Sequence, residues 1–303
     1  MFPSVLVVTA ADDRYRRSLT QLLASIERVD PAGEIRVLVA DLGLGPTMRA
    51  RATARFPRIA WADFDLSHVP AFARPRARRV NTNGWKPRVV DEAFARAGRA
   101  GVRHVLWLDA ASVLTASPAP ALRHAEGHGL WIPFGGKGSI GDRTHPTALA
   151  SPFAPGKVPA TALRRRMRAS GVMAFDTHSD VARWVCDTWT AGCADPTLLC
   201  PPGATLDDHR FDQSVLNLVL ECEGPFGRVA DRIGTDALDI SSAHPVPWLR
   251  SRNKVHRSVP DAADPLVRAW FRMRRDVDVT AWRVREALAP RGPETATRDL
   301  DGA

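Results

Sequence analysis

Residues 4–13 read SVLVVTAADD, and their pattern indicates the fold class. Its first six residues form an apolar run rich in β-branched side chains, which is typical of a strand buried on both faces of a parallel sheet. After a polar turn, Leu19, Leu22, Leu23 and Ile26 recur at helical spacing. The chain therefore begins with a strand followed by a helix.

The same alternation continues along the chain. Apolar runs predict strands at residues 35–40 (IRVLVA), within 59–65 and at 104–108 (HVLWL), with a helix beginning near Trp85 between the last two. Further on, the sequence predicts a strand at 170–175 and helices at 181–191 and 210–221. Residues 135–157 are rich in Gly, Pro, Ser and Thr, so we expect a long loop there. This order of elements predicts an α/β fold with a mostly parallel, Rossmann-like central sheet flanked by helices.

Polar residues follow two of these strands, and in such sheets ligands bind at the carboxyl ends of the strands. Residues 9–13 (TAADD) follow the first strand, and residues 109–112 (DAAS) follow the strand at 104–108. The glycine-rich fingerprint of dinucleotide-binding enzymes is absent after the first strand. The two segments are therefore the first place to look for chemistry, and for a ligand other than a dinucleotide.

Charge points weakly to an anionic partner. The 303 residues carry a formal charge of +9 with a pI near 10.3, and the basic residues are arginines apart from four lysines. No nucleic-acid-binding motif accompanies this charge, so we do not expect a nucleic-acid partner.

The beginning of the chain lacks the features of a signal peptide and no apolar run is long enough to span a bilayer, so we expect a cytoplasmic protein. The four cysteines form no Cys-x-x-Cys pair and are expected to be reduced and structural.

Five motifs in order resemble the GT-A glycosyltransferases, in particular the glycogenin-like and lipopolysaccharide galactosyltransferase group. They are VVTAADDRY, NGWKPRVVDEAF, VLWLDAAS, SGVMAFD and DDHRFDQSVLN, and the resemblance covers most of residues 4–220. It implies a GT-A domain at 1–258, with a nucleotide-binding half at 1–115 and an acceptor-side half at 116–258. A C-terminal helix and polar tail follow at 259–303. The implied activity is transfer of a hexose from a nucleotide-diphosphate sugar, UDP-linked in this family, to a saccharide, a lipid-linked sugar or a small molecule.

The resemblance also assigns roles around the donor nucleotide. Residues from Thr9 to Tyr15, including Ala10, Ala11 and Asp12, would hold the base and ribose; Asp12 or Asp13 could instead cap the following helix. Lys86 would lie near the donor, where a cation could neutralise the diphosphate. The alternative for Lys86 is an ordinary solvated surface lysine.

Further residues would meet the sugar. Ser170 and Gly171 match the family's strand along the sugar and acceptor cleft, although Ala169 replaces an asparagine. Asp212 and Gln213 match the pair that faces the transferred sugar. Burying a carboxylate at the start of a helix costs folding free energy unless the charge is paired. This favours a functional role for Asp212. The alternative is that Asp212 caps that helix.

The metal site of the family is altered in this chain. GT-A enzymes carry Asp-x-Asp after the central strand to hold Mn²⁺ or Mg²⁺ on the diphosphate. Here Asp109 keeps the first carboxylate, but Ala111 replaces the second. Either Ser112 with water, or His244 or His256, completes a site, or the enzyme uses Lys86 and arginines without a metal.

Two other functions stay open from the sequence. The first is a nucleotide-sugar-binding protein that has lost catalysis, as Ala111 suggests, and the second is another Rossmann-type enzyme such as a dehydrogenase or methyltransferase. The basic, tryptophan-bearing helix expected at 267–288 could also rest on an anionic membrane surface.

Overall fold

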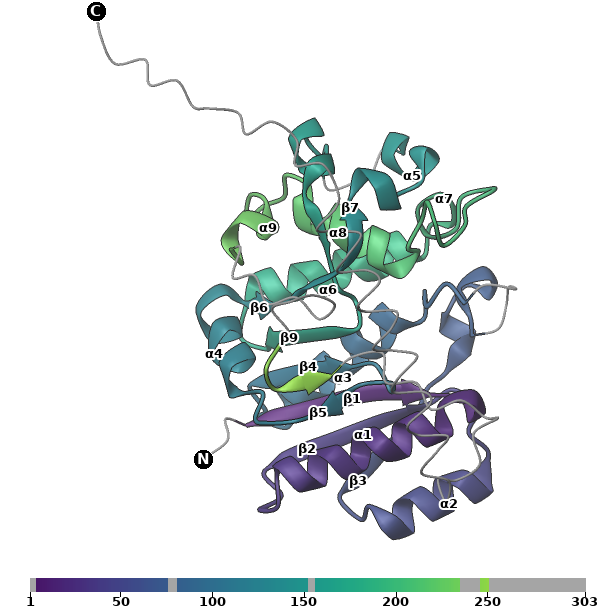
Figure 1. Cartoon of the computed structure of the whole chain (residues 1–303), viewed down its shortest axis with the longest axis vertical. Coiled ribbons are helices and arrows are strands. Elements are labelled where there is room, and N and C mark those ends of the chain that lie inside the picture. Colours follow the sequence, from purple (N-terminus) through teal and green to yellow (C-terminus); the bar gives the residue numbers. More distant parts are fainter. Residues whose placement is uncertain (1–3, 76–80, 152–155, 235–245, 251–303) are drawn as a thin grey trace, which may run out of the picture. The chain divides into compact units, whose positions relative to one another are not determined.

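The computed structural model describes residues 4–75, 81–151, 156–234 and 246–250 of the chain. A six-stranded sheet in the order β3-β2-β1-β4-β9-β6 forms its centre (Figure 1). The strands are β1 (Val5–Ala11), β2 (Ile35–Asp41), β3 (Ile59–Asp63), β4 (His104–Leu108), β6 (Leu130–Trp131) and β9 (Val172–Asp176). Strands β1 to β4 run parallel, and β9 is antiparallel to both of its neighbours. The predicted mostly parallel central sheet is thus confirmed.

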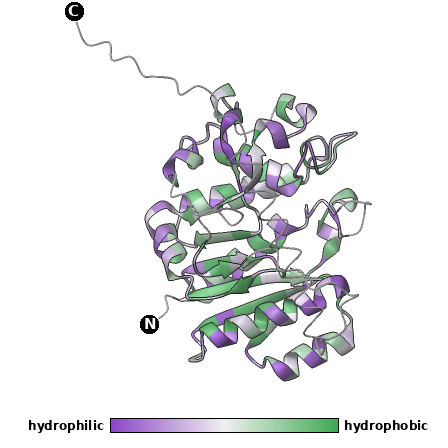
Figure 2. Cartoon of the chain, in the orientation of Figure 1, coloured by the Kyte–Doolittle hydropathy of each residue, from purple (hydrophilic) through white to green (hydrophobic). Residues whose placement is uncertain are grey.

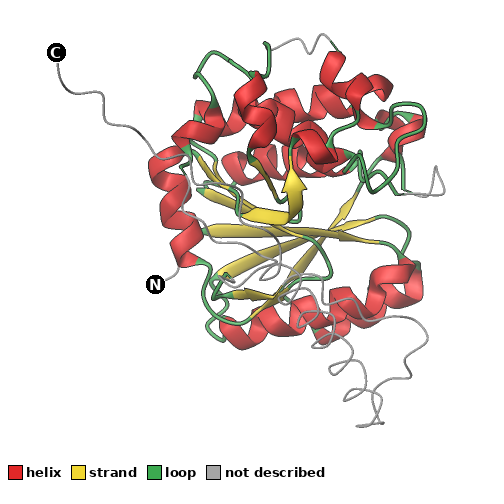
Figure 3. Ribbon diagram, turned by 45° about the horizontal axis from the view of Figure 1, so that its top comes forward, coloured by secondary structure: helices red, strands yellow, loops and turns green. Residues whose placement is uncertain are grey.

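Helices cover both faces of this sheet (Figure 3). The α-helices are α1 (Arg16–Val29), α2 (Pro46–Arg55), α3 (Lys86–Arg99), α4 (Ala119–His128), α5 (Pro146–Ala150), α6 (Asp180–Cys193), α7 (Pro196–Leu199), α8 (Asp212–Glu221) and α9 (Val229–Arg232). Short 3-10 helices lie at Asp13–Tyr15, Leu66–His68, Ala71–Ala73, Gly141–Arg143 and Ala160–Arg164. The helices predicted at 181–191 and 210–221 correspond to α6 and α8.

Strand β1 shows why both faces need cover. Val5 and Val7 belong to a core cluster with the apolar faces of α1 and α4, whereas Leu6 and Val8 belong to a second cluster with α3, α6 and α8. Successive side chains of a strand point to opposite faces, so a continuous apolar run is stable only between two helical layers. The central strands are accordingly hydrophobic along their length in Figure 2.

Two small antiparallel sheets complete the described part of the chain. Strand β5 (Val113–Leu114) pairs with β10 (Leu249–Arg250), and β7 (Phe134–Ser139) pairs with β8 (Arg166–Arg168). The prediction of a long loop at 135–157 was wrong, because β7, a 3-10 helix and α5 occupy much of that range. Gly135 permits this pairing, since a Cβ there would lie 2.5 Å from the Ala169 Cβ.

Some predictions fall outside the described residues. The C-terminal extension at 259–303, the helix within it and its membrane contact stay predictions, as does the domain boundary at residue 258. Among the described residues, no helix is both long and apolar enough to cross a membrane.

Candidate functional site

The carboxyl ends of β1 and β4 lie side by side, because the two strands pair in parallel with Val8 opposite Trp107. A cavity of about 160 Å³ opens at this edge of the sheet. Its lining comprises Ala10, Ala11, Asp12, Tyr15, Leu42, Pro75, Asn81, Asn83, Trp85, Lys86, Trp107, Asp109, Ala110 and Ala111. The two segments predicted from the strand ends therefore share one cavity, which we call the strand-end cavity.

A second, larger cavity of about 520 Å³ adjoins it, and we call it the helix-start cavity. Its lining comprises Asn81, Asn83, Lys86, Asp109, Ala111, Ser112, Gly135, Ala169, Ser170, Gly171, Leu206, Arg210, Phe211, Asp212 and Gln213. The two cavities have five lining residues in common: Asn81, Asn83, Lys86, Asp109 and Ala111. These five form the junction of the two cavities.

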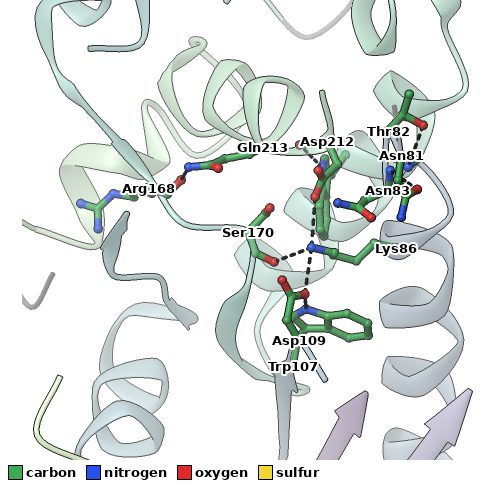
Figure 4. A network of polar contacts seen from close by, with 12 residues as sticks. Asn81, Thr82, Asn83, Lys86, Trp107, Asp109, Arg168, Ser170, Asp212 and Gln213 are labelled. Carbon is green, nitrogen blue, oxygen red and sulfur yellow. Dashed lines mark hydrogen bonds and ion pairs between the residues drawn. The ribbon is translucent and has the colours of Figure 1, made fainter. Parts of the chain in front are cut away.

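Lys86 is the first residue of α3, and its side chain is buried at the junction with a relative exposure of 2%. Its Nζ lies 3.0 Å from Asp109 Oδ1 and 3.2 Å from Asp212 Oδ2, and it donates to the Ser170 carbonyl at 3.1 Å. Figure 4 shows the ammonium group between the two carboxylates. Lys86 is therefore not a solvated surface lysine.

Charge and burial act against each other in this cluster. Burial disfavours the ammonium form of Lys86, but Asp109 and Asp212 outweigh it and raise the pKa of the lysine above its usual value. Burial raises the pKa of Asp212, and the opposing effects of Lys86 and Ser170 do not compensate for it. The lysine thus stays charged, and Asp212 is more basic than a solvated aspartate.

Asp109 differs from its two partners because its side chain is 46% exposed. Its Oδ1 also accepts a hydrogen bond of 3.0 Å from Trp107 Nε1, and its backbone N–H donates to the Gly171 carbonyl at 2.9 Å. A Cβ at Gly171 would lie 2.9 Å from Asp109 Oδ2, so the glycine makes room for this carboxylate. Asp109 thus lines both cavities and is held by Trp107 of β4 and by Gly171, which directly precedes β9.

Asp212 begins α8, directly after Phe211, whose φ is +53°. This angle is uncommon for a bulky residue and is tolerated where the surroundings enforce it. The backbone carbonyl of Asp212 accepts from the buried Trp189 Nε1 at 2.9 Å. Phe211, not Asp212, is the cap residue of α8, so the predicted alternative that Asp212 is the N-cap was wrong.

Gln213 links α8 to the small sheet. Its Nε2 donates to the Arg168 carbonyl at 2.8 Å and to the Gly135 carbonyl at 3.2 Å. The side-chain amide therefore fixes the wall of the helix-start cavity on which Asp212 sits.

Most of the other predicted site residues line one of the two cavities. Ala10, Ala11, Asp12, Tyr15 and Ala111 line the strand-end cavity, and Ser170 and Gly171 line the helix-start cavity. Asp12 also accepts a hydrogen bond from Arg14 N–H at 2.9 Å, so it caps the 3-10 helix at Asp13–Tyr15 as well. Thr9 is fully buried in β1 and is absent from both linings. His244 and His256 lie outside the described residues.

The sequence motifs contain Asn83 and Arg210 but gave them no role at the site, and Asn81 was missed. Asn83 adopts a φ of +52°, which asparagine tolerates better than most residues, and this turn leads directly into Trp85 and Lys86. An Asn-x-Asn-Gly run before a buried helix was the available signal. Arg210 lies next to the motif around Asp212, and its position in the cavity wall depends on the tertiary fold.

The residues of the junction do not fit a divalent cation. Mn²⁺ and Mg²⁺ need several oxygen ligands, but the second carboxylate position is Ala111, and Asp109 is already paired with an ammonium group. Ser112 lines the helix-start cavity but is 1% exposed. Within the described residues, no group of three or more His, Cys, Asp or Glu side chains could hold a metal ion.

Comparison with known proteins gives structural neighbours only. No family model matches the chain, and no curated protein matches it. The chain is similar to the galactosyltransferase LgtC in complex with donor and acceptor sugar analogs, at 18% identity and a TM-score of 0.40, over 72% of this chain and 71% of the other. An active-site mutant of LgtC gives 19% identity and a TM-score of 0.42 over the same shares of the two chains.

A third neighbour is core-mannan synthase A from Aspergillus fumigatus in its Mn/GDP form. It gives 9% identity and a TM-score of 0.47, over 72% of this chain and 70% of the other. The neighbours include glycosyltransferases, the class that the sequence motifs resemble. All three TM-scores lie below 0.5, so the likeness is loose and the function of this chain has to be inferred from its own site.

Proposed function

We propose that this chain is a GT-A-type glycosyltransferase that transfers a hexose from a nucleoside diphosphate sugar, UDP-linked, to a saccharide, lipid-linked or small-molecule acceptor. The observation that carries the proposal is the pair of cavities that meet at Lys86 and Asp109. A nucleotide sugar has the same layout: a nucleoside and a sugar joined by a charged diphosphate.

The strand-end cavity suits the nucleoside. Tyr15, Trp85 and Trp107 give it aromatic walls, and the backbone after β1 offers polar groups for a base edge. Asp12 lines this cavity and would supply a carboxylate for a ribose hydroxyl. This is the position at which open α/β sheets bind ligands, at the carboxyl ends of the strands.

The helix-start cavity suits the transferred sugar and the acceptor. Ser170, Arg210, Asp212 and Gln213 supply polar groups that can recognise hydroxyls. In the reaction the bond between the anomeric carbon and the diphosphate breaks with its electron pair on the phosphate oxygen. An acceptor hydroxyl forms the new bond to that carbon, and its proton passes to the leaving diphosphate or to Asp212. Asp212 would bind the sugar or stabilise positive charge at the anomeric carbon, and could accept that proton if the configuration inverts.

A thermal-shift screen of the full chain tests the proposal with UDP, GDP, TDP, NAD and S-adenosylmethionine, each with and without Mn²⁺. A ligand at about 100 times its Kd stabilises a protein by about 2.7 kcal/mol, which is a shift of several degrees for a domain of this size. We expect the shift from a nucleoside diphosphate. A shift from NAD or S-adenosylmethionine alone would favour another Rossmann-type enzyme.

Turnover separates an enzyme from a protein that only binds nucleotide sugars. We expect slow release of UDP from UDP-glucose or UDP-galactose in water, and we expect Asp212→Asn to lose this release while it still binds UDP. Asp187→Asn is the matched control, because Asp187 is 58% exposed on α6 and absent from both cavity linings. UDP binding with no release from either donor by the unmodified chain would favour the binding protein.

A further inference from the structure

The junction of the two cavities has one cationic side chain among the described residues that form it, and this is Lys86. A diphosphate that joins a nucleoside in one cavity to a sugar in the other has to pass this junction. Negative charge grows there when the sugar leaves, so a positive group must stand near it. The question is therefore whether the diphosphate is neutralised by the ammonium group of Lys86 or by a bound divalent cation.

A divalent cation would compete with Lys86 for the same ligands. Asp109 Oδ1 lies 3.0 Å from the ammonium group and also accepts from Trp107, and Asp212 Oδ2 lies 3.2 Å from the same ammonium group. A cation bound by either carboxylate would lie close to a buried positive charge that cannot move into solvent. With Ala111 as neighbour, no second carboxylate of the β4 segment offsets that repulsion.

The ammonium group can exchange one partner. Asp109 Oδ1, Asp212 Oδ2 and the Ser170 carbonyl oxygen lie 3.0, 3.2 and 3.1 Å from its Nζ, so a phosphate oxygen has to replace one of them. Ser170 offers a backbone carbonyl, and the Asp212 side chain is 4% exposed. Asp109, at 46% exposed, is the partner with room to turn towards solvent.

We propose that this chain binds its nucleoside diphosphate donor without a divalent cation, and that the Lys86 ammonium group takes a phosphate oxygen in place of the Asp109 carboxylate. The inference rests on the proposed function and adds the means by which the diphosphate is neutralised. Asp109 then acts as a competitor for Lys86 when no donor is bound. It is not a ligand of the donor.

Isothermal titration calorimetry of UDP and GDP against the full chain tests this, first in EDTA and then in excess Mn²⁺. We expect the same affinity in both buffers. Lys86→Gln should weaken binding in both by on the order of 10- to 100-fold, the range of a charge-assisted hydrogen bond. Lys157→Gln removes an exposed lysine that is absent from both cavity linings and should change nothing.

The variant Asp109→Asn changes the affinity for nucleotide in opposite directions, depending on whether Asp109 competes for Lys86 or holds a metal ion. If Asp109 competes for Lys86, the variant binds UDP or GDP several-fold more tightly, in EDTA as well. If Asp109 holds a metal, the variant loses binding. The Asp109→Asn titration is informative whether or not Lys86→Gln folds. Circular dichroism of Lys86→Gln and the conservative variant Lys86→Arg check that fold separately.

Binding that requires Mn²⁺, or loss of binding in Asp109→Asn, would overturn the inference and leave the proposed function standing. Tight Mn²⁺ binding to the chain without nucleotide, seen as loss of the free-ion signal in electron paramagnetic resonance, would also overturn it. If neither nucleotide binds in either buffer, the proposed function fails, and the inference fails with it.

Discussion

Replacing Lys86 with methionine tests the buried ion pair that holds the candidate site together. The substitution keeps an unbranched side chain, one atom shorter, but leaves Asp212, at 4% side-chain exposure, without its ammonium partner. Removing one member of a buried pair costs about 3–5 kcal/mol, because an uncompensated charge stays in the interior. Asp212 can limit this cost by taking up a proton, so the loss depends on pH.

The direction of that dependence follows from the raised pKa of Asp212, which burial causes and which the lysine opposes. A group whose pKa is higher in the folded state than in the unfolded state stabilises the fold at low pH, and this stability is lost as the pH rises through the folded-state pKa. The deficit of Lys86→Met should therefore be larger at about pH 8 than at about pH 5. Adding Asp212→Asn removes the unpaired charge and should recover about 1–3 kcal/mol.

Urea unfolding followed by tryptophan fluorescence measures these differences. Lys157→Met removes an exposed lysine and should stay within about 0.5 kcal/mol of the unmodified chain. A loss below about 1 kcal/mol in Lys86→Met at the higher pH would refute the reasoning. So would additive losses in the double variant, since they would mean that Lys86 and Asp212 do not interact.

Two further predictions concern residues beside the site. Burial lowers the pKa of His209 to about 4, so stability should fall by on the order of 3 kcal/mol as the pH drops from about 6.5 towards 4. Urea unfolding across this range should show a flatter profile for His209→Gln, and an unchanged profile would contradict the prediction. Gly171→Ala places a Cβ 2.9 Å from Asp109 Oδ2, so this half-exposed carboxylate has to turn away from Lys86, and we expect a loss of about 1 kcal/mol. Thermal unfolding measures this against Gly98→Ala, whose Cβ would meet nothing within 4 Å and which should be neutral or stabilising; equal effects of the two would contradict it.

The strands of the sheet were predictable because their signal is local. The runs at residues 4–9, 35–40 and 104–108 became β1, β2 and β4 with bounds that differ by at most two residues. Their continuous apolar character reflects burial on both faces, which the sequence records directly. The position of Asp12 and Asp109 at one edge then follows from the geometry of parallel strands.

The small sheet of β7 and β8 was not predictable in the same way. Its first strand reads FGGKGS, which has weak strand propensity, and it forms by pairing with a segment some thirty residues further along the chain. The antiparallel direction of β9 is equally a property of the assembled sheet.

The residue pattern alone predicts an α/β protein with polar residues after β1 and β4, and it points to Lys86, Asp109 and Asp212 as residues of interest. It left open whether Lys86 is solvated, whether Asp212 is a helix cap and whether Asp109 holds a metal. The tertiary structure decided the first two by bringing together the start of α3, the end of β4 and the start of α8. Strand and helix patterns record local burial, whereas the ion pairs of Lys86 depend on which distant segments the fold brings together around its buried ammonium group.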